Sequence, residues 1–445
     1  MNDSGDRLAG EGRIRCASLP ESLKVAGIVL VPLMMQGVLQ RRPWAVSLLA
    51  RLDVDRWGNR VLRRLRRRHG GSSVLVNLLG RRMVVLLSPG DVHRVLEGSP
   101  QPFTLDNREK HASLSQFEPH GVLISTGPVR EARRAYNEEI LDTAHPVHRL
   151  GETIGAVVRE EAGVLLGNAR AAGGVVTWPL FAESFWRTVR RVVLGDAARD
   201  DVEVTGELSR LRADANWSYL RRPRPRVREA MMRRIRTYVG QGQAGCLAAL
   251  VAATPAGPDV DPVGQMTQWL FAFDGAGTAS FRLMALLATH PEQERRADAD
   301  RTGQLDYLRA CVLDCLRLWP TTLVVLRDGT EPIRWGTVTV PAGTAFAAPS
   351  SFLHRDEELL PYAHRFAPEI WLDGTADDNW SLIPFSGGPG VCPGRNLVLL
   401  VTSVLLAELR REHRFTLRSR PALTPQRPLP YMLNHGAIRL GLAPR

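Results

Sequence analysis

Apolar residues at helical spacing occupy most of the chain, whereas alternating apolar and polar runs are short and few. Positions that recur every three or four residues predict a helix over residues 43–69 and mainly helical structure over 128–166, 178–195 and 202–240, with breaks at Pro146, Gly195, Pro223 and Pro225. Residues 263–289 form a long apolar run without proline, which predicts a long buried helix that ends at His290-Pro291. Within the helix over 43–69, Leu62 and Leu65 are expected to face inward, and the arginines around them, Arg63, Arg64, Arg66, Arg67 and Arg68, to face mostly solvent.

The strand signals are confined to two regions. Two apolar runs within residues 74–87 flank Gly80-Arg81-Arg82 and predict a β-hairpin, followed by a helix that begins near Ser88. A helix over residues 305–318 precedes short strands around 324–326 and 335–340. No internal repeat or long linker interrupts the chain, so the pattern predicts a mainly α fold with small β-sheets in a single large domain.

Residues 1–44 form a separate N-terminal segment, with the large domain expected over residues 45–445. The segment is polar up to Glu21, and its apolar run over 25–39 contains Gly27, Pro32 and Gln36. That run is shorter than the roughly 20 apolar residues of a membrane span, so no stable span is expected. We interpret it as a buried or channel-lining segment, with a membrane-surface or substrate-entry segment as the alternative.

Composition narrows the class of protein. The chain has 445 residues, 44% hydrophobic and 23% charged, as in globular proteins, and a net charge of +12. Lys24 and Lys110 are its only lysines and its arginines are scattered, so we do not expect it to bind nucleic acid. Five widely spaced cysteines make a disulfide framework improbable and favour a reducing, cytoplasmic location.

A glycine- and proline-rich loop over residues 384–395 carries the chemistry that the sequence reveals most directly. It surrounds Cys392 and leads into a predicted helix over 396–411. Glycines so dense are costly unless a tight turn or a close approach requires them. A thiolate at the start of a helix is stabilised by the helix dipole, and haem iron is one metal that a single cysteine thiolate holds.

The spacing Phe385-x-x-Gly388-x-x-x-Cys392-x-Gly394 resembles the haem-binding loop of the cytochrome P450 superfamily. Asp314-x-x-Arg317 is similar to the Glu-x-x-Arg pair of that family, with a shorter acid. The resemblance extends from about residue 45 to residue 445 and implies a cytochrome P450-like fold, with haem b between the long helix and the loop. Cys392 would be the axial ligand of the iron, and Phe385, Gly388 and Gly394 would contact the haem.

The resemblance also implies arginines for the haem propionates. Gly127-Pro128-x-Arg130-x-x-x-Arg134 is similar to the family's helix that reaches them, with Arg130 where Trp or His is usual. Arg327 stands where a further propionate arginine is expected. Two departures accompany these matches: Gly390 replaces the usual Arg or His two residues before the cysteine, and Ile370 replaces an arginine of the Glu-x-x-Arg network.

The long helix departs further from the family. Counted back from His290-Pro291, Asp274 falls on the family's catalytic acid and Gly275 on its threonine, so the threonine hydroxyl is missing. A shifted register would instead use Thr278 or Ser280. We expect protons to travel through Asp274 with water, through one of these hydroxyls, or through a hydroxyl of the substrate.

The resemblance implies an enzyme that oxidises a hydrophobic small molecule, taken here as a bacterial secondary metabolite, with O2. Electrons would come from a separate ferredoxin and ferredoxin reductase, and the positive chain, including Arg395 beside the loop, would suit an acidic ferredoxin. Two alternatives remain. The first is the same fold with altered chemistry, such as peroxide-driven oxidation, desaturation, coupling or rearrangement, and the second is a non-catalytic haem-binding protein.

Overall fold

The structure is a computed structural model that describes residues 14–78, 80–300, 302–336 and 338–445. Its helices are, in chain order, α1 (Leu19–Val25), the π-helical turn η1 (Ala26–Leu30), α2 (Val31–Gln36), α3 (Pro43–Arg51), α4 (Val54–Arg68), α5 (Pro89–Glu97), α6 (Arg108–Leu114), η2 (Val122–Ile124), α7 (Gly127–Ile140), α8 (Gly151–Ala171), α9 (Trp178–Leu194), η3 (Asp196–Ala198), α10 (Val202–Ala215), α11 (Pro225–Gln241), α12 (Leu247–Ala253), α13 (Pro262–Leu287), α14 (Pro291–Ala299), α15 (Asp306–Leu318), α16 (Ser350–His354), η4 (Pro368–Trp371), η5 (Gly388–Gly390), α17 (Arg395–Arg411) and η6 (His435–Ala437).

The strands are short and pair into small sheets. They are β1 (Arg15–Cys16), β2 (Val74–Leu78), β3 (Arg81–Val85), β4 (Phe103–Thr104), β5 (Val175–Thr177), β6 (Val324–Gly329), β7 (Ile333–Trp335), β8 (Val338–Val340), β9 (Ala345–Pro349), β10 (His413–Leu417) and β11 (Arg439–Pro444). The largest sheet has the order β1-β2-β3-β9-β6-β4, and smaller ones have the orders β10-β11-β5 and β7-β8. The fold is therefore mainly α with small sheets in one domain, as predicted.

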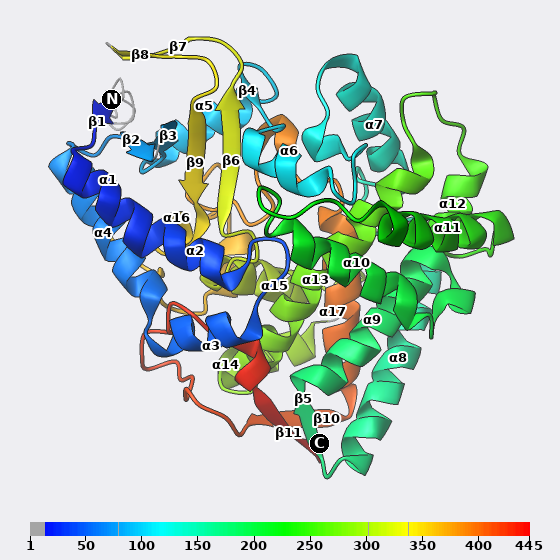
Figure 1. The fold of residues 1–445 in the computed structure, drawn as a ribbon. Helices are drawn as coiled ribbons and strands as arrows, with labels where there is room; N and C mark the ends of the chain where they lie inside the picture. The colour runs from blue at the N-terminus through cyan, green and yellow to red at the C-terminus, as the bar shows by residue number, and fades with distance from the viewer. Residues whose placement is uncertain (1–13, 79, 301, 337) are drawn as a thin grey trace, which may run out of the picture.

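Helix α13 lies at the centre of the helical part of the molecule (Figure 1). It packs against α9, α15, α17 and α11, which explains why its residues are apolar almost all round. Asp261 caps its start by accepting a hydrogen bond from the Gly264 amide at 3.1 Å. The predicted long buried helix is confirmed, and a second apolar core lies between the largest sheet, α4 and α5.

The predicted hairpin is confirmed: β2 and β3 are antiparallel, with Val74 opposite Val85. Ser88 caps α5 by accepting a hydrogen bond from the Asp91 amide at 3.2 Å. The helix predicted over residues 43–69 is instead two helices, α3 and α4, which separate at Leu52 and Asp53. Asp53 has a left-handed backbone, with φ at 49°, and that conformation ends the first helix.

The interior of α4 differs from the prediction at one arginine. Leu62 and Leu65 are buried, as expected. Arg66, predicted to face mostly solvent, is also buried and forms ion pairs with Asp356 and Glu358. A buried guanidinium needs carboxylate partners, and these come from a segment almost 300 residues away. Helical periodicity in α4 alone does not reveal them.

The N-terminal apolar run is a continuous helix over Leu19–Gln36 that lies on the surface, along the left side of Figure 1. Only 17% of it is buried, so the interpretation as a buried segment is wrong. This helix and α13 are the two helices of the described chain long and apolar enough to cross a membrane, although α13 is 67% buried, like a core helix. Length and composition alone are weak evidence for a span.

Candidate functional site

The cysteine loop lies between α5 and α17. The Cys392 amide donates to the Phe385 carbonyl at 2.9 Å, and the Val391 amide donates to the Gly388 carbonyl at 3.0 Å, so the loop folds back on itself. Gly388 has φ at +58°, and a Cβ there would overlap the Leu96 carbonyl oxygen of α5. The glycine thus serves both a left-handed turn and a close backbone approach.

Cys392 is half-buried, two residues before the cap of α17 at Gly394. Burial raises the pKa of the Cys392 thiol, while the Gly394 amide and the cations Arg134 and Arg395 act in the opposite direction. Because burial is the largest of these effects, the thiol is expected to lose its proton when a bound metal ion stabilises the thiolate.

Among the residues that the structure describes, Cys392 has no neighbouring group of protein metal ligands. Across the described residues, no group of three or more His, Cys, Asp or Glu side chains could hold a metal ion. All five cysteines are free thiols, and Cys311 and Cys315 are buried in the core at 0% exposure. A metal at Cys392 would therefore have to bring its other ligands with it, as haem iron does.

Buried cations gather beside the loop. Arg130, which is 5% exposed, has its Nε and Nη2 atoms buried without a hydrogen-bond partner among the described residues. Arg327 is 3% exposed, and burial first and the charge of Arg130 second lower its pKa to about 10. Buried guanidinium groups without a carboxylate partner among the described residues are costly, so Arg130 and Arg327 are expected to receive an anion.

Lys110 joins this cluster, and the sequence interpretation missed it. Its ammonium group donates to the carbonyls of Leu105 at 2.7 Å and Leu326 at 2.9 Å. Its pKa is lowered well below the ordinary value by burial first and by Arg327 second. The one signal in the sequence was its rarity, because this arginine-rich chain has only two lysines.

Arg327 also accounts for one departure from the family pattern. Its Nη2 atom lies where a Cβ on Gly390 would come within 2.6 Å, so the guanidinium fills the space beside the glycine. The same atom lies 3.3 Å from the Ser386 hydroxyl, and Nε donates to the Ser99 hydroxyl at 2.9 Å. The structure thus brings Arg327 from β6 to the cysteine loop, as expected for a residue of the same site.

Arg134 lies against the loop itself. Its Nη1 donates to the Val391 carbonyl at 2.7 Å, and its Nε donates to Glu138 at 2.6 Å. The guanidinium therefore holds the backbone next to Cys392 in place, and two of its nitrogens already have partners. Its predicted role on a haem propionate stays a prediction.

On α13, the expected catalytic acid has a partner from another helix. Asp274 Oδ2 accepts from Arg212 Nη2 of α10 at 2.7 Å, and the Asp274 side chain is 28% exposed while that of Arg212 is 3% exposed. Arg212 also donates to the Leu39 carbonyl and stacks over Phe271, 4.6 Å from the ring centroid. This ion pair ties α10 and the N-terminal segment to α13.

Gly275 and Ser280, the other candidate positions on α13, also have close neighbours. A Cβ on Gly275 would lie 3.1 Å from the hydroxyl oxygen of Thr321, in the loop after α15. Ser280 is fully buried, and its hydroxyl donates to the Ala276 carbonyl at 2.9 Å, within its own helix. Thr321 and Arg212 are therefore further residues at this site that sequence interpretation missed, because both contacts join distant segments.

Asp314 and Arg317 form a completely buried ion pair. Arg317 Nε donates to Asp314 Oδ1 at 2.5 Å, and Arg317 Nη2 also donates to the Arg365 carbonyl at 2.6 Å. Asp314 accepts from the Ala367 amide at 2.8 Å and from the indole of Trp371 at 3.4 Å. Backbone groups and this indole complete the network in which the family usually has an arginine.

The comparisons with known proteins agree with this site. Residues 283–435, which include the cysteine loop, match the family model described as Cytochrome P450. The relatives include cyclooctat-9-en-7-ol 5-monooxygenase of Streptomyces melanosporofaciens, 32% identical over 34% of this chain and 35% of its own length. They also include secologanin synthase 1 of Catharanthus roseus, 31% identical over 33% of this chain and 32% of its own length.

Cytochrome P450 4c21 of Blattella germanica is 30% identical over 33% of each chain. Each of these matches thus spans about a third of the relative's own length. Together with the family match, they show that the segment containing Cys392 is similar to cytochromes P450, and the mainly α fold with small sheets is consistent with that similarity. Because the relatives come from a bacterium, a plant and an insect, they do not assign a bacterial origin.

Haem, the group that the family implies, fits the residues present. Cys392 offers a lone thiol at a helix start, and Arg130 offers two buried nitrogens without partners among the described residues. Arg327 and Lys110 add positive charge on the same side. A neutral or cationic ligand would leave this charge uncompensated, whereas the two propionates of a haem would balance it.

Proposed function

We propose that this protein is a haem-thiolate monooxygenase that oxidises a hydrophobic small molecule with O2. The observation that carries the proposal is the lone Cys392 thiol beside the buried cations Arg130 and Arg327. When bound, the haem supplies the activation of O2. Cys392 would hold its iron, and Arg130, Arg327 and Lys110 would hold its propionates.

Proton delivery would fall to side chains on α13 and in contact with it. The Asp274 carboxylate lies 2.7 Å from Arg212 and is 28% exposed, so water can reach it. Thr321 places a hydroxyl against Gly275, where the family's own helix would carry one. These groups are our candidates for proton delivery.

The first test is spectroscopic. The haem-loaded protein, reduced and exposed to carbon monoxide, should show the strongly red-shifted Soret band of thiolate ligation. Cys392→Ser should lose that band, while Cys16→Ser, which removes an exposed thiol, should keep it. A spectrum typical of histidine ligation in the unmodified protein would overturn the assignment.

The second test concerns electrons and substrate. We expect a ferredoxin and its reductase to support turnover, with docking near the exposed Arg395. The rate of reduction should then fall steeply as salt rises.

Cyclooctat-9-en-7-ol is a suitable first substrate to test, because a relative's name states that it is a substrate of that protein. We further propose a reducing, cytoplasmic location, which the free cysteines support.

A second candidate function is peroxide-driven or otherwise altered oxidation on the same fold. It is favoured by the ion pair of Asp274 with Arg212 and by the hydrogen bond of Ser280 within its helix, which leave little free proton-donating capacity on α13. Turnover with hydrogen peroxide alone, faster than with ferredoxin and O2, would support it. Haem binding without turnover under either condition would indicate a non-catalytic haem protein.

A further inference from the structure

Two arginines beside the candidate site form no ion pair with a carboxylate of the described residues. Arg41, in the segment that joins α2 to α3, donates to the Thr321 carbonyl at 2.7 Å. Arg282, on α13, donates to the carbonyls of Leu433 at 3.0 Å and Trp319 at 3.3 Å. A guanidinium has five N–H donors, so both arginines keep donors for a ligand.

These contacts place both arginines near Gly275. Thr321, whose carbonyl accepts from Arg41, also lies against Gly275 through its hydroxyl. Arg282 follows Gly275 by seven residues, so the two lie on the same side of α13, about 10 Å apart along its axis. Gly275 and Arg282 are half-buried, whereas the residues on either side of Arg282 are fully buried. The arginines therefore lie along the side of α13 that its neighbours leave partly uncovered.

The charges around Arg41 do not balance. Burial first and Arg282 second lower the pKa of Arg41 to about 10, so it stays charged at neutral pH. Asp274 and Asp55 act in the opposite direction, and Arg212 acts in the same direction. Asp274 already pairs with Arg212 at 2.7 Å. Three arginines against two acids leave one positive charge, which is costly in the interior unless an anion joins it.

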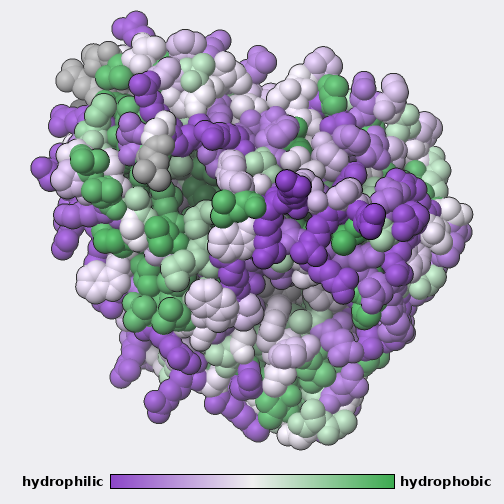
Figure 2. Space-filling model, viewed as in Figure 1, coloured by the Kyte–Doolittle hydropathy of each residue, from purple (hydrophilic) through white to green (hydrophobic). Residues whose placement is uncertain are grey.

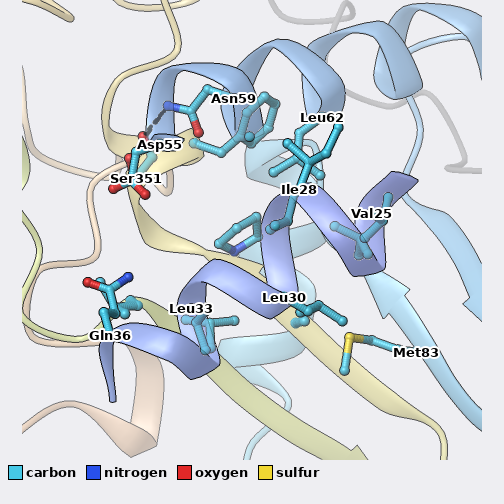
Figure 3. Close-up of a pocket in the computed structure, with 18 residues that line it drawn as sticks. Val25, Ile28, Leu30, Leu33, Gln36, Asp55, Asn59, Leu62, Met83 and Ser351 are labelled. Atoms are coloured by element: carbon cyan, nitrogen blue, oxygen red, sulfur yellow. Dashed lines mark hydrogen bonds between the residues drawn. The ribbon is translucent and has the colours of Figure 1, made fainter. Parts of the chain in front are cut away.

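Asp55 does not close this gap. It belongs to the first turn of α4 and lies at the polar end of the pocket under the N-terminal helix, where Gln36 and Ser351 also lie (Figure 3). Burial raises its pKa to about 6, although the charge of Arg41 acts in the opposite direction. Within the described part of the chain, it forms no ion pair with Arg41 or Arg282.

A further polar group beside Arg282 lacks a partner. His435, in η6, follows Leu433 by two residues, and its Nδ1 atom is buried without a hydrogen-bond partner among the described residues. Its ring packs edge-on against Trp178, with the centroids 4.4 Å apart. Burial, then Arg282 and then Arg41 lower the pKa of His435 to about 3, so the ring is neutral. A neutral imidazole can donate to an anion through this nitrogen.

The surroundings of these polar groups are apolar. On α13, Phe271, Ala272 and Gly275 are all at least partly uncovered. Figure 2 shows apolar side chains gathered over α1, α2 and α3, the helices next to the segment that carries Arg41. A molecule that fits this environment has an apolar body and one anionic group.

We propose that Arg41 and Arg282 bind the carboxylate of the substrate, which makes the substrate an apolar acid. A carboxylate carries one negative charge, the amount that the cluster lacks, and its two oxygens suit guanidinium groups. A phosphate group would bring nearly two charges. The inference rests on the proposed function, because it takes the molecule oxidised beside Gly275 to be the one whose carboxylate reaches the arginines.

The test measures how imidazoles that coordinate haem iron bind to the haem-loaded chain. Two series of probes have an alkyl chain of increasing length on the imidazole, which ends in a carboxylate in one series and in a hydroxyl in the other. The shift of the Soret band reports coordination, so no turnover is required. At the chain lengths that reach Arg41 and Arg282, we expect the acid to bind at least about tenfold more tightly than the alcohol of equal length.

Variants of the two arginines identify the groups that bind the acid. Arg41→Gln and Arg282→Gln should each lower the preference for the acid by at least about fivefold, whereas Arg41→Lys, which keeps the charge, should retain most of it. Arg309→Gln is the matched control, because buried Arg309 also donates to backbone carbonyls, those of Gln304 at 2.7 Å and Pro146 at 2.6 Å. It should leave the preference unchanged.

Two results would overturn the inference. The first is equal affinity for acid and alcohol at every chain length in the unmodified chain, a comparison that does not depend on whether a variant folds. The second is a preference for the acid that survives in both glutamine variants, since another cation would then bind it. A chain without the spectrum of thiolate ligation would overturn the proposed function and this inference with it. That spectrum without a preference for the acid would overturn this inference alone.

Discussion

The guanidinium of Arg327 occupies the space beside Gly390: its Nη2 atom would lie 2.6 Å from a Cβ at that position. The residues belong to β6 and to η5, 63 positions apart in the chain. The family that this chain resembles usually has a basic residue at the position of Gly390, and here an arginine from another element supplies positive charge in that space. The small side of Gly390 and the guanidinium of Arg327 therefore depend on each other: the arginine fits only because residue 390 is a glycine.

The first prediction follows from this dependence. Gly390→Arg should displace Arg327 and place two guanidinium groups in one space, so the protein should retain less haem and unfold at a lower temperature. The double variant Gly390→Arg, Arg327→Gly should recover most of both properties. Haem content per chain and thermal unfolding measure the two effects. Equal haem content and stability in all three proteins would contradict this dependence of Arg327 on Gly390.

Replacing Arg130 should have opposite effects on two properties: the stability of the haem-free protein and the retention of haem. Because two of its nitrogens are buried without partners among the described residues, Arg130→Met should stabilise the haem-free protein by about 1–3 kcal/mol. The same variant should release haem faster, because a propionate loses its partner. Urea unfolding of the haem-free protein and transfer of haem to an acceptor protein measure the two. A loss of stability in the haem-free protein would show that Arg130 has a partner there.

A double variant can separate the structural role of Asp274, its ion pair with Arg212, from its role in turnover. Asp274→Asn should destabilise the protein by about 1–3 kcal/mol, since it leaves buried Arg212 without its carboxylate, and should impair O2-driven turnover. The double variant Asp274→Asn, Arg212→Gln should recover stability but not turnover. Recovery of both would mean that Asp274 only holds α10 against α13.

Gly275→Thr tests whether Thr321 already fills the space beside Gly275. The new side chain would begin 3.1 Å from the Thr321 hydroxyl, so it should not improve turnover and should lower stability. Thr321→Ala in the same chain should relieve the contact. Alone, Thr321→Val should reduce coupled turnover more than Thr321→Ser if the hydroxyl delivers protons. Equal rates for these two variants would limit Thr321 to packing.

His354 predicts acid sensitivity of the fold. It is fully buried, and its Nε2 accepts from the Ile383 amide at 3.0 Å, which requires a neutral ring. Burial, followed by the charge of Arg317, lowers the pKa of His354 from 6.5 to about 3. Its contribution to stability is therefore present above about pH 6.5 and is lost as pH falls toward the folded pKa, since only the unfolded ring takes up a proton.

His354→Gln should make the free energy of unfolding less dependent on pH between about 6.5 and 3, by up to about 1.4 kcal/mol per pH unit. Unfolding by urea at a series of pH values compares the two proteins. Parallel curves for His354→Gln and the unmodified chain would contradict the assignment.

The sequence by itself determined the features that depend on local backbone and on periodicity. The helical core, the hairpin and the buried α13 follow from apolar spacing, and each is present. The cysteine loop was also readable, because Gly388 must adopt φ near +58° and lie against α5, which restricts the residue locally. Requirements of this kind restrict the residue types within one segment, so they can be recognised from the sequence of that segment alone.

Tertiary structure alone decided which distant side chains share a space. Arg212 with Asp274, Thr321 with Gly275, and Arg66 with Asp356 are separated by tens to hundreds of residues, and nothing in either local segment indicates the partner. The N-terminal helix shows the same limit. Its apolar residues predicted burial, but the protein body covers only one side, because β2, β3 and α4 offer a single surface on which it can pack.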